Sequence, residues 1–203
     1  MSRPSSADVR RYWNRHIHDL AISTHPPGTP GFFADLDQYH FEKLHHLLRL
    51  VDFDAWRNRA VLDVGCGAGV EVVRFARAGA HMTGVDLSEQ AVGLSRLNVQ
   101  QQGLRASLSV ADGEALPFPD GTFDYVFAHG VVQYAADDAR VVAECHRVLK
   151  PGGVALFQVY NRRSWLNLLS TVMQTPLEHE DAPVLRRYSI PEFRALVRRF
   201  SRV

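Results

Sequence analysis

The sequence predicts one α/β domain built on a doubly wound, mostly parallel β-sheet. Short apolar runs with strand character alternate with amphipathic helical patterns along most of the chain, an order typical of parallel sheets with right-handed crossovers. One run passes into a glycine-rich turn at 65–69 and then directly into an apolar helical pattern. Aspartates stand at the ends of successive runs, where the ligands of such sheets bind.

The elements are predicted in order from the N-terminus. Tyr12 and Trp13 suit either an N-terminal helix core or a pocket wall, and the apolar positions of 39–51 share one helical face. Strands are expected at about 60–64, 81–86, 106–111, 123–128 and 154–160. Helices are expected after residue 69, between a Ser88 cap and Gly103, from Asp137 or Asp138 to a break at 150–153, and from a capping box at 189–192.

Composition limits the function classes. The chain has 203 residues, of which 46% are hydrophobic, and a net charge of +1, which fits one soluble domain with a full core. Neither a nucleic acid nor a membrane is expected as partner, because the charges balance and no apolar run reaches membrane-spanning length. Cys66 and Cys145 suit a reducing compartment better than a disulfide framework. We therefore expect a cytoplasmic protein.

The glycine turn indicates a nucleotide-type ligand. Glycines at alternate positions let the backbone approach a ligand closely, and a helix N-terminus favours negative charge. A dinucleotide fingerprint has its third glycine at the sixth position of the turn, where this chain has Val70. Asp63 can face a cationic group or cap the turn, and Asp86 can accept both hydrogen bonds of a ribose diol. Together these features favour S-adenosylmethionine over NAD.

Four motifs occur in one order, VLDVGCGAG (61–69), GVDLS (84–88), ADGEALPFPDGTFDYV (111–126) and RVLKPGG (147–153). They resemble the class I S-adenosylmethionine-dependent methyltransferases, in particular a small-molecule, type 11-like bacterial branch. The resemblance implies a Rossmann-like fold, S-adenosylmethionine as cofactor and S-adenosylhomocysteine as product. It also implies a set of cofactor-binding residues, namely Asp63, Gly65, Cys66, Gly67, Gly69, Asp86, Leu87, Ser88, Asp112, Gly113, Glu114 and His129.

Roles within this set are likewise implied by the resemblance. The glycines would line the methionine portion, Asp86 would hold the ribose and Leu87 would pack on the adenine. Asp112 would bond the adenine amino group, and His129 would lie near the sulfonium and the acceptor.

Methyl transfer from a sulfonium is an in-line displacement, so alignment and desolvation supply much of the rate. A general base is needed only if the acceptor arrives protonated. His18, His129 and Tyr134 are the predicted catalytic residues, with His16 as a further candidate. Related sequences often have His-His where this chain has Gln133-Tyr134. We expect methyl transfer to an O, N or C atom of a small molecule, or alternatively a protein that binds the cofactor without catalysis.

No metal site is predicted, because His16 and His18 lie on different helical faces and lack the spacing of zinc ligands. An apolar stretch at 165–173 suits either a packing helix or a cover over the substrate.

The single domain is expected to comprise a helical lid (1–58), a cofactor-binding core (59–160) and a cover segment with the C-terminal helix (161–203). The resembling family continues with two more strands, whereas this sequence ends at Val203. The expected result is an uncovered edge at the fifth strand. We therefore expect a truncated product, or else a homodimer or another partner that covers this edge.

Overall fold

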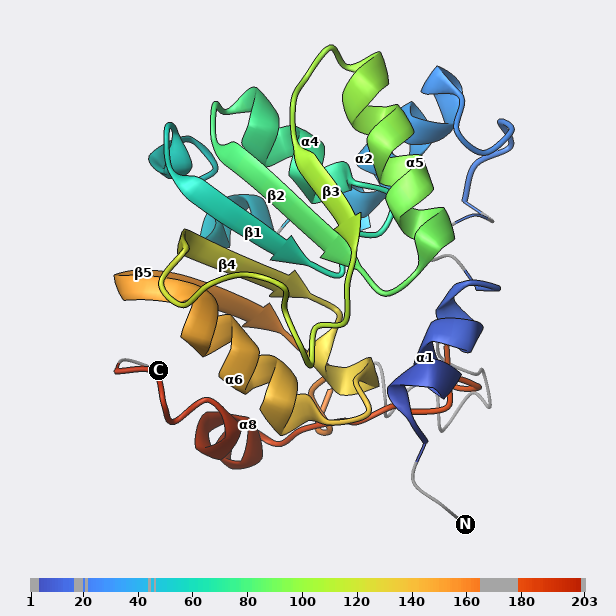
Figure 1. Cartoon of the computed structure of the whole chain (residues 1–203). Helices are drawn as coiled ribbons and strands as arrows, with labels where there is room; N and C mark the ends of the chain where they lie inside the picture. The colour runs from blue at the N-terminus through green and yellow to red at the C-terminus, as the bar shows by residue number, and fades with distance from the viewer. Residues whose placement is uncertain are drawn as a thin grey trace.

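The computed structural model describes residues 4–16, 20, 22–43, 45, 47–164 and 179–201. In this part of the chain, five strands form one sheet in the order β3-β2-β1-β4-β5, and every pairing is parallel (Figure 1). The strands are β1 (Ala60–Val64), β2 (His81–Asp86), β3 (Ser107–Val110), β4 (Phe123–His129) and β5 (Leu149–Gln158). The strand order reverses at β1 and β4, which is where ligands bind in open α/β sheets. The predicted doubly wound α/β fold is confirmed.

Helices cover both faces of the sheet (Figure 1). One face packs against α4 (Val70–Arg77), α5 (Glu89–Gln101) and the short α3 (Leu47–Leu50), with α2 (Pro30–Lys43) outside α4. The other face packs against α6 (Asp138–Val148) and α8 (Ile190–Leu196). Two 3₁₀ turns, η1 (Asp54–Trp56) and η2 (Val132–Tyr134), precede β1 and α6. The helix α1 (Ser6–Trp13) lies beyond the carboxyl ends of the strands (Figure 1).

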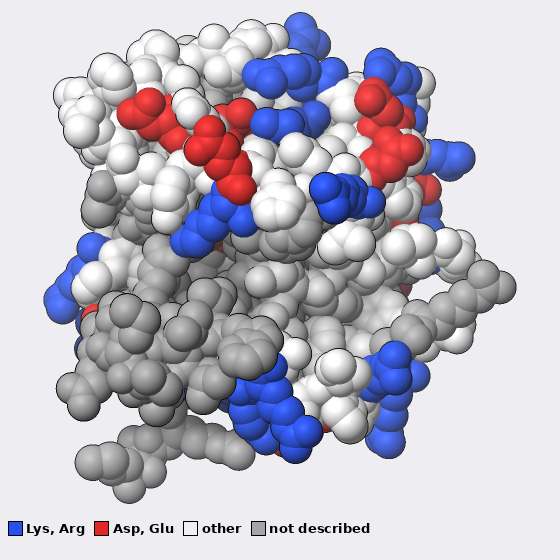
Figure 2. Space-filling view, turned by 180° about the vertical axis from the view of Figure 1, so that it is seen from behind, with Lys and Arg blue, Asp and Glu red and all other residues white. Residues whose placement is uncertain are grey.

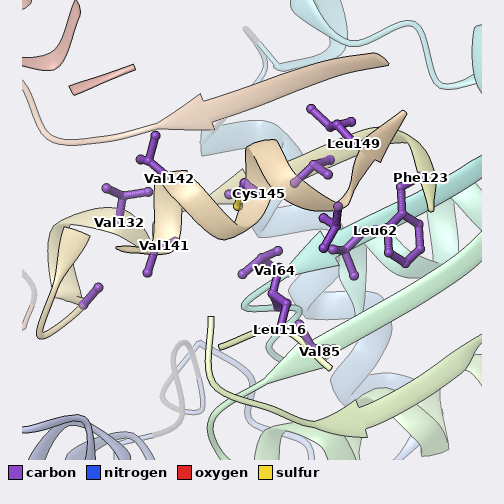
Figure 3. Packing of buried hydrophobic residues seen from close by; sticks show 14 of the residues in the cluster. Leu62, Val64, Val85, Leu116, Phe123, Val132, Val141, Val142, Cys145 and Leu149 are labelled. Atoms are coloured by element: carbon purple, nitrogen blue, oxygen red, sulfur yellow. The ribbon is translucent and has the colours of Figure 1, made fainter. Parts of the chain in front are cut away.

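Alternate side chains of the central strands enter two separate cores. Val61 lies in the cluster on the α4 side, whereas Leu62 and Val64 pack with α6 residues such as Val142 and Cys145 (Figure 3). Both faces are therefore buried, which explains why these strands read as continuous apolar runs rather than alternating ones. Each fully buried aliphatic side chain contributes about 1.5–3 kcal/mol.

The predicted helix at 39–51 was wrong in its extent. α2 begins at Pro30 and ends at Lys43, and α3 is a separate helix. The Thr29 hydroxyl accepts a hydrogen bond from the Phe32 N–H (3.3 Å), and Pro30 occupies the first helical position, where its missing N–H costs nothing. Four buried side chains hold α2 to the domain, Phe32, Phe33, Leu36 and Phe41.

The fifth strand begins earlier than predicted. α6 ends at Val148 and β5 starts at once at Leu149, so residues 150–153 end the helix but belong to the strand. The register moves from Phe123 opposite Leu149 to Tyr125 opposite Val154, which marks a bulge. Within the described residues β5 pairs only with β4 and forms an edge of the sheet.

Acidic and basic side chains lie interspersed over the upper half of the face seen in Figure 2, as the near-zero net charge leads one to expect. None of the helices in the described ranges combines the length and apolar character that crossing a membrane requires.

Candidate active site

The glycine turn after β1 is strained for any other residue. Gly65, Gly67 and Gly69 have φ of +75°, +51° and +80°. A Cβ at Gly65 would lie 2.3 Å from Val131, and one at Gly69 would lie 2.4 Å from the Ser95 hydroxyl. A Cβ at Gly67 would meet no described atom within 4 Å. Packing thus requires glycine at two positions, while the third borders open space where a ligand can approach the backbone.

Asp86 ends β2 and holds the turn. Its carboxylate accepts hydrogen bonds from the N–H groups of Gly67 (3.0 Å) and Ser88 (2.8 Å). Burial raises the pKa of Asp86, while these N–H groups act in the opposite direction. A carboxylate offers about four acceptor positions, so Asp86 has capacity left for a diol. Leu87 beside it is half-buried.

Asp63 is a buried acid at the end of β1, with only 2% of its surface exposed. Its Oδ2 atom has no hydrogen-bond partner among the described residues. Burial, and then the charges of Glu71 and Asp86, raise its pKa well above the ordinary value. A buried acceptor without a partner is costly, and the amino group of a bound amino-acid moiety would satisfy it. The residues present therefore fit S-adenosylmethionine.

The loop after β3 uses its side chains to hold itself together. Asp112 accepts a hydrogen bond from the Glu114 N–H (2.9 Å), and Glu114 accepts one from the Asp137 N–H at the start of α6 (2.9 Å). Gly113 lies against Val64. The Glu114 carboxylate is thereby engaged in fastening the loop, so a contact with a ligand from this residue would come from its backbone.

Cys66 points away from the open side of the turn. It is 3% exposed, belongs to the core cluster on the α4 side, and burial raises the pKa of its thiol well above the ordinary value. This environment suits a small packing residue rather than a nucleophile.

The three predicted catalytic residues are placed differently. His129 ends β4, with its Nδ1 atom 3.4 Å from Glu71 Oε1 and its Nε2 atom buried without a hydrogen-bond partner in the described structure. Tyr134 is 6% exposed and its hydroxyl donates to that of Tyr160 (3.1 Å). His18 lies outside the described residues. The further candidate His16 is exposed.

The helix α1 and the residue after it contact both the start of α5 and the η2 turn. Asn14, just after α1, accepts hydrogen bonds from the Ser88 hydroxyl (2.9 Å) and the Glu89 N–H (3.1 Å). Trp13 makes an edge contact with the Tyr134 ring, with centroids 4.9 Å apart. The Tyr12 hydroxyl donates to Asp181 (2.7 Å). Trp13 is thus half-buried against a residue of the candidate site. The apolar stretch at 165–173 lies outside the described residues.

Sequence reasoning missed two residues of this region, His40 and Glu71. The His40 Nε2 atom lies 2.8 Å from Glu71 Oε1, and Glu71 also faces His129. Burial acts to raise the pKa of Glu71, but the two imidazoles hold it well below its usual range. The one signal in the local sequence that could have identified Glu71 is its charge, because its neighbours in the first turn of α4 are apolar.

Comparisons with known proteins agree with this geometry. Residues 62–157 match the family described as "Methyltransferase domain". The chain is 38% identical over 128 residues to a ubiquinone biosynthesis O-methyltransferase of Aromatoleum aromaticum, covering 60% of this chain and 55% of that protein. It is 41% identical over 111 residues to a sterol 24-C-methyltransferase of Gibberella zeae, covering 52% and 27%.

A similar solved structure is the putative methyltransferase of Haloferax volcanii in complex with the Trm112 activator. Its TM-score is 0.64 at 27% identity, covering 85% of this chain and 73% of that one. The match spans about half the length of the ubiquinone-pathway relatives. The parallel sheet, the glycine turn and these matches together show that this chain is similar to the class I S-adenosylmethionine-dependent methyltransferases.

Proposed function

We propose that this chain binds S-adenosylmethionine beyond the carboxyl ends of β1 and β2 and transfers its methyl group to a small molecule. The observation that carries the proposal is the unpaired, buried Oδ2 of Asp63 beside the open backbone of Gly67. Asp86, at the next strand end, supplies the acceptor for a ribose. The product is S-adenosylhomocysteine.

The residues of this chain would act mainly by holding the cofactor and the acceptor in the geometry that methyl transfer requires. Asp63 holds the amino group of the cofactor and Asp86 the ribose, so the sulfonium lies near the carboxyl end of β4. The acceptor then lies beside His129, under the cover of Trp13 and Tyr134. His129, oriented by Glu71 at its Nδ1, would take the proton from an acceptor that arrives protonated. Tyr134 would orient the acceptor, and covering the site would exclude water.

The acceptor class follows from the walls of the site. The rings of Trp13, Tyr134 and His179 lie in mutual edge contact, with centroids 4.8–6.2 Å apart, and Tyr160 adjoins Tyr134. Aromatic walls favour an acceptor with a flat or apolar body. The two relatives are named as an O- and a C-methyltransferase, which supports O or C as the methylated atom, with N as the third candidate. Phenols are the first class to test.

Isothermal titration with S-adenosylmethionine, S-adenosylhomocysteine and NAD tests the cofactor assignment. Asp86→Ala should weaken binding of the first two by about 1.5–3 kcal/mol, the value of hydrogen bonds to a charged group. Asp54→Ala is the matched control, because Asp54 is an exposed carboxylate in η1, away from the site. Unchanged affinity in Asp86→Ala, or binding of NAD in preference, would contradict the assignment.

A second candidate is a protein that binds the cofactor without catalysis. It is favoured by Gln133 and Tyr134, because Gln133 is completely buried and the Tyr134 hydroxyl already bonds Tyr160. A turnover screen with small phenols, amines and acids separates the two. Tight binding of S-adenosylhomocysteine without methylation of any acceptor would favour the second candidate.

The edge of β5 and the cysteines support two further parts of the proposal. A second copy of the chain would cover the β5 edge, where Val154 is half exposed. Sedimentation that finds only monomers at micromolar concentration would refute this dimer.

A cytoplasmic location is proposed because Cys66 and Cys145 are both buried and unpaired. Recovery of the protein with the membrane fraction would refute that location.

A further inference from the structure

We propose that His40, Glu71 and His129 form a binding site for a divalent transition-metal ion, with Zn²⁺ as the ion that suits it best. The three side chains come from α2, the first turn of α4 and the end of β4. Their ligand atoms all lie within 4.8 Å of one another. The nearest pairs are His40 Nε2 to Glu71 Oε1 at 2.8 Å and His129 Nδ1 to Glu71 Oε1 at 3.4 Å.

This spacing fits a tetrahedral ion. With metal–ligand bonds of about 2.0–2.2 Å, the ligand atoms of such a site lie about 3.3 Å apart. The two distances to Glu71 Oε1 bracket that value, and the ligand atoms of the two histidines lie within 4.8 Å of each other, so rotations of the side chains would seat an ion. Two imidazoles and one carboxylate also form the ligand set of open, catalytic zinc sites, which keep a fourth position for water or substrate. Mg²⁺ and Ca²⁺ prefer oxygen ligands, so a site with two imidazole nitrogens disfavours them.

Burial and charge favour a cation at this place. The side chains of both histidines are 15% exposed and that of Glu71 is 10% exposed. Asp63 lies close enough for the charge of Glu71 to act on it. Among the described residues Glu71 has ion pairs only with the two histidines. Glu71 thus places one negative charge between two imidazoles in a largely buried position, and a bound cation would neutralise that charge.

The cluster is held in place by contacts other than its own. Arg74, one turn after Glu71, donates two hydrogen bonds to Asp37 of α2 (3.2 and 2.9 Å). Its guanidinium also lies 3.5 Å from the centroid of the Phe41 ring. α2 is therefore fastened to α4 on either side of His40 without any metal. Replacing one ligand should leave this packing intact, which makes the site testable by mutation.

The open position would lie beside the acceptor side of the candidate site, since His129 belongs to both. A bound divalent cation lowers the pKa of a hydroxyl that it contacts. With the ion on Nδ1 of His129, that imidazole has no free lone pair, so the cation would replace His129 in promoting deprotonation of the acceptor. The inference goes beyond the proposed methyl transfer and is tested without turnover, so either can fail while the other stands.

The experiment uses the full chain, freed of metal by a chelator and titrated with Co²⁺ as a spectroscopic probe. We expect one Co²⁺ per chain with the intense visible absorption of a tetrahedral site, displaced by one equivalent of Zn²⁺. Glu71→Gln and His40→Gln should each weaken binding about 100-fold or more, beyond the 10–100-fold that outer-shell changes cost. His81→Gln is the matched control, because His81 is an exposed histidine at the start of β2, and it should bind as the parent protein does.

Circular dichroism and thermal unfolding establish that each variant is folded. If one ligand variant does not fold, the other decides. Absence of a saturable Co²⁺ band in the parent protein would overturn the proposal. So would equal affinity in the parent and in a folded ligand variant, since the ion would then bind elsewhere.

Discussion

Replacing Gly67 with alanine should separate the cost of backbone strain from the cost of blocking the cofactor. Gly67 has φ of +51°, and an added Cβ would meet no described atom within 4 Å. The folded chain therefore loses only what a left-handed conformation costs a residue with a Cβ, about 1–2 kcal/mol. For a chain of this size that lowers the Tm by about 2–8 °C. The same methyl group would occupy the space where the cofactor approaches the backbone, so its affinity should fall by at least about tenfold, or 1.4 kcal/mol.

Gly103→Ala is the matched control. Gly103 ends α5 with φ of +65°, and its Cβ would also meet no described atom within 4 Å. Both variants should therefore lose similar stability in thermal unfolding, while only Gly67→Ala loses affinity for S-adenosylhomocysteine in calorimetry. Gly65→Ala should be less stable than either, because its Cβ would lie 2.3 Å from Val131. Full affinity in Gly67→Ala would refute the close approach of a ligand at this turn.

Three further predictions concern stability. Burial disfavours the ionised form of Asp63 and raises its pKa. Asp63→Asn should therefore raise the Tm of the ligand-free protein and weaken cofactor binding. A lower Tm would show that the carboxylate stabilises the free fold. Hydrogen bonds from Lys150 (2.8 Å) and from the Ala60 N–H (2.9 Å) lower the pKa of Asp124, so Asp124→Asn should cost about 1–3 kcal/mol at neutral pH. The difference in unfolding free energy between the parent protein and the variant is complete above the ordinary Asp pKa of about 3.9. It should vanish as the pH falls through the lowered pKa of Asp124 in the folded protein. A difference that persists in acid would refute the charge-based account. Leu62→Ala, in a fully buried position, should cost about 2–5 kcal/mol in urea unfolding, and a loss below 1 kcal/mol would contradict the packing of the α6-side core.

The strand that runs into the glycine turn and the aspartate that ends the next strand were predicted from short segments of the chain. The hydrogen bond from the Gly67 N–H to Asp86, which closes the turn, was not predicted, and the predicted contacts of these residues with a cofactor stay predictions. The start of α2 was missed although its signal, Thr29 followed by Pro30, is present in the sequence. The apolar period at 39–51 obscured it, because α2 and α3 follow each other closely and both bury apolar side chains.

The bulge in β5 was beyond local reasoning for a different reason. Residues 150–153 (Lys-Pro-Gly-Gly) have the composition of a turn that ends a helix, and α6 does end just before them, at Val148. Pairing with β4 nevertheless retains these residues within the strand as an irregularity in register. Strand boundaries of this kind depend on the neighbouring strand, which the sequence of one segment does not contain.

The sequence by itself predicted the α/β fold, the resemblance to a methyltransferase family and the glycine turn proposed to receive the donor, because backbone conformation, strand ends and helix starts are properties of short segments. Only the tertiary structure decided which side chains meet at the end of β4. His40, Glu71 and His129 lie on three separate elements, and no spacing along the chain brings them together. Their contact depends on how α2 packs on α4 and on where β4 ends. The physical reason is that a ligand set is defined by distances between atoms, and packing of the whole domain sets those distances.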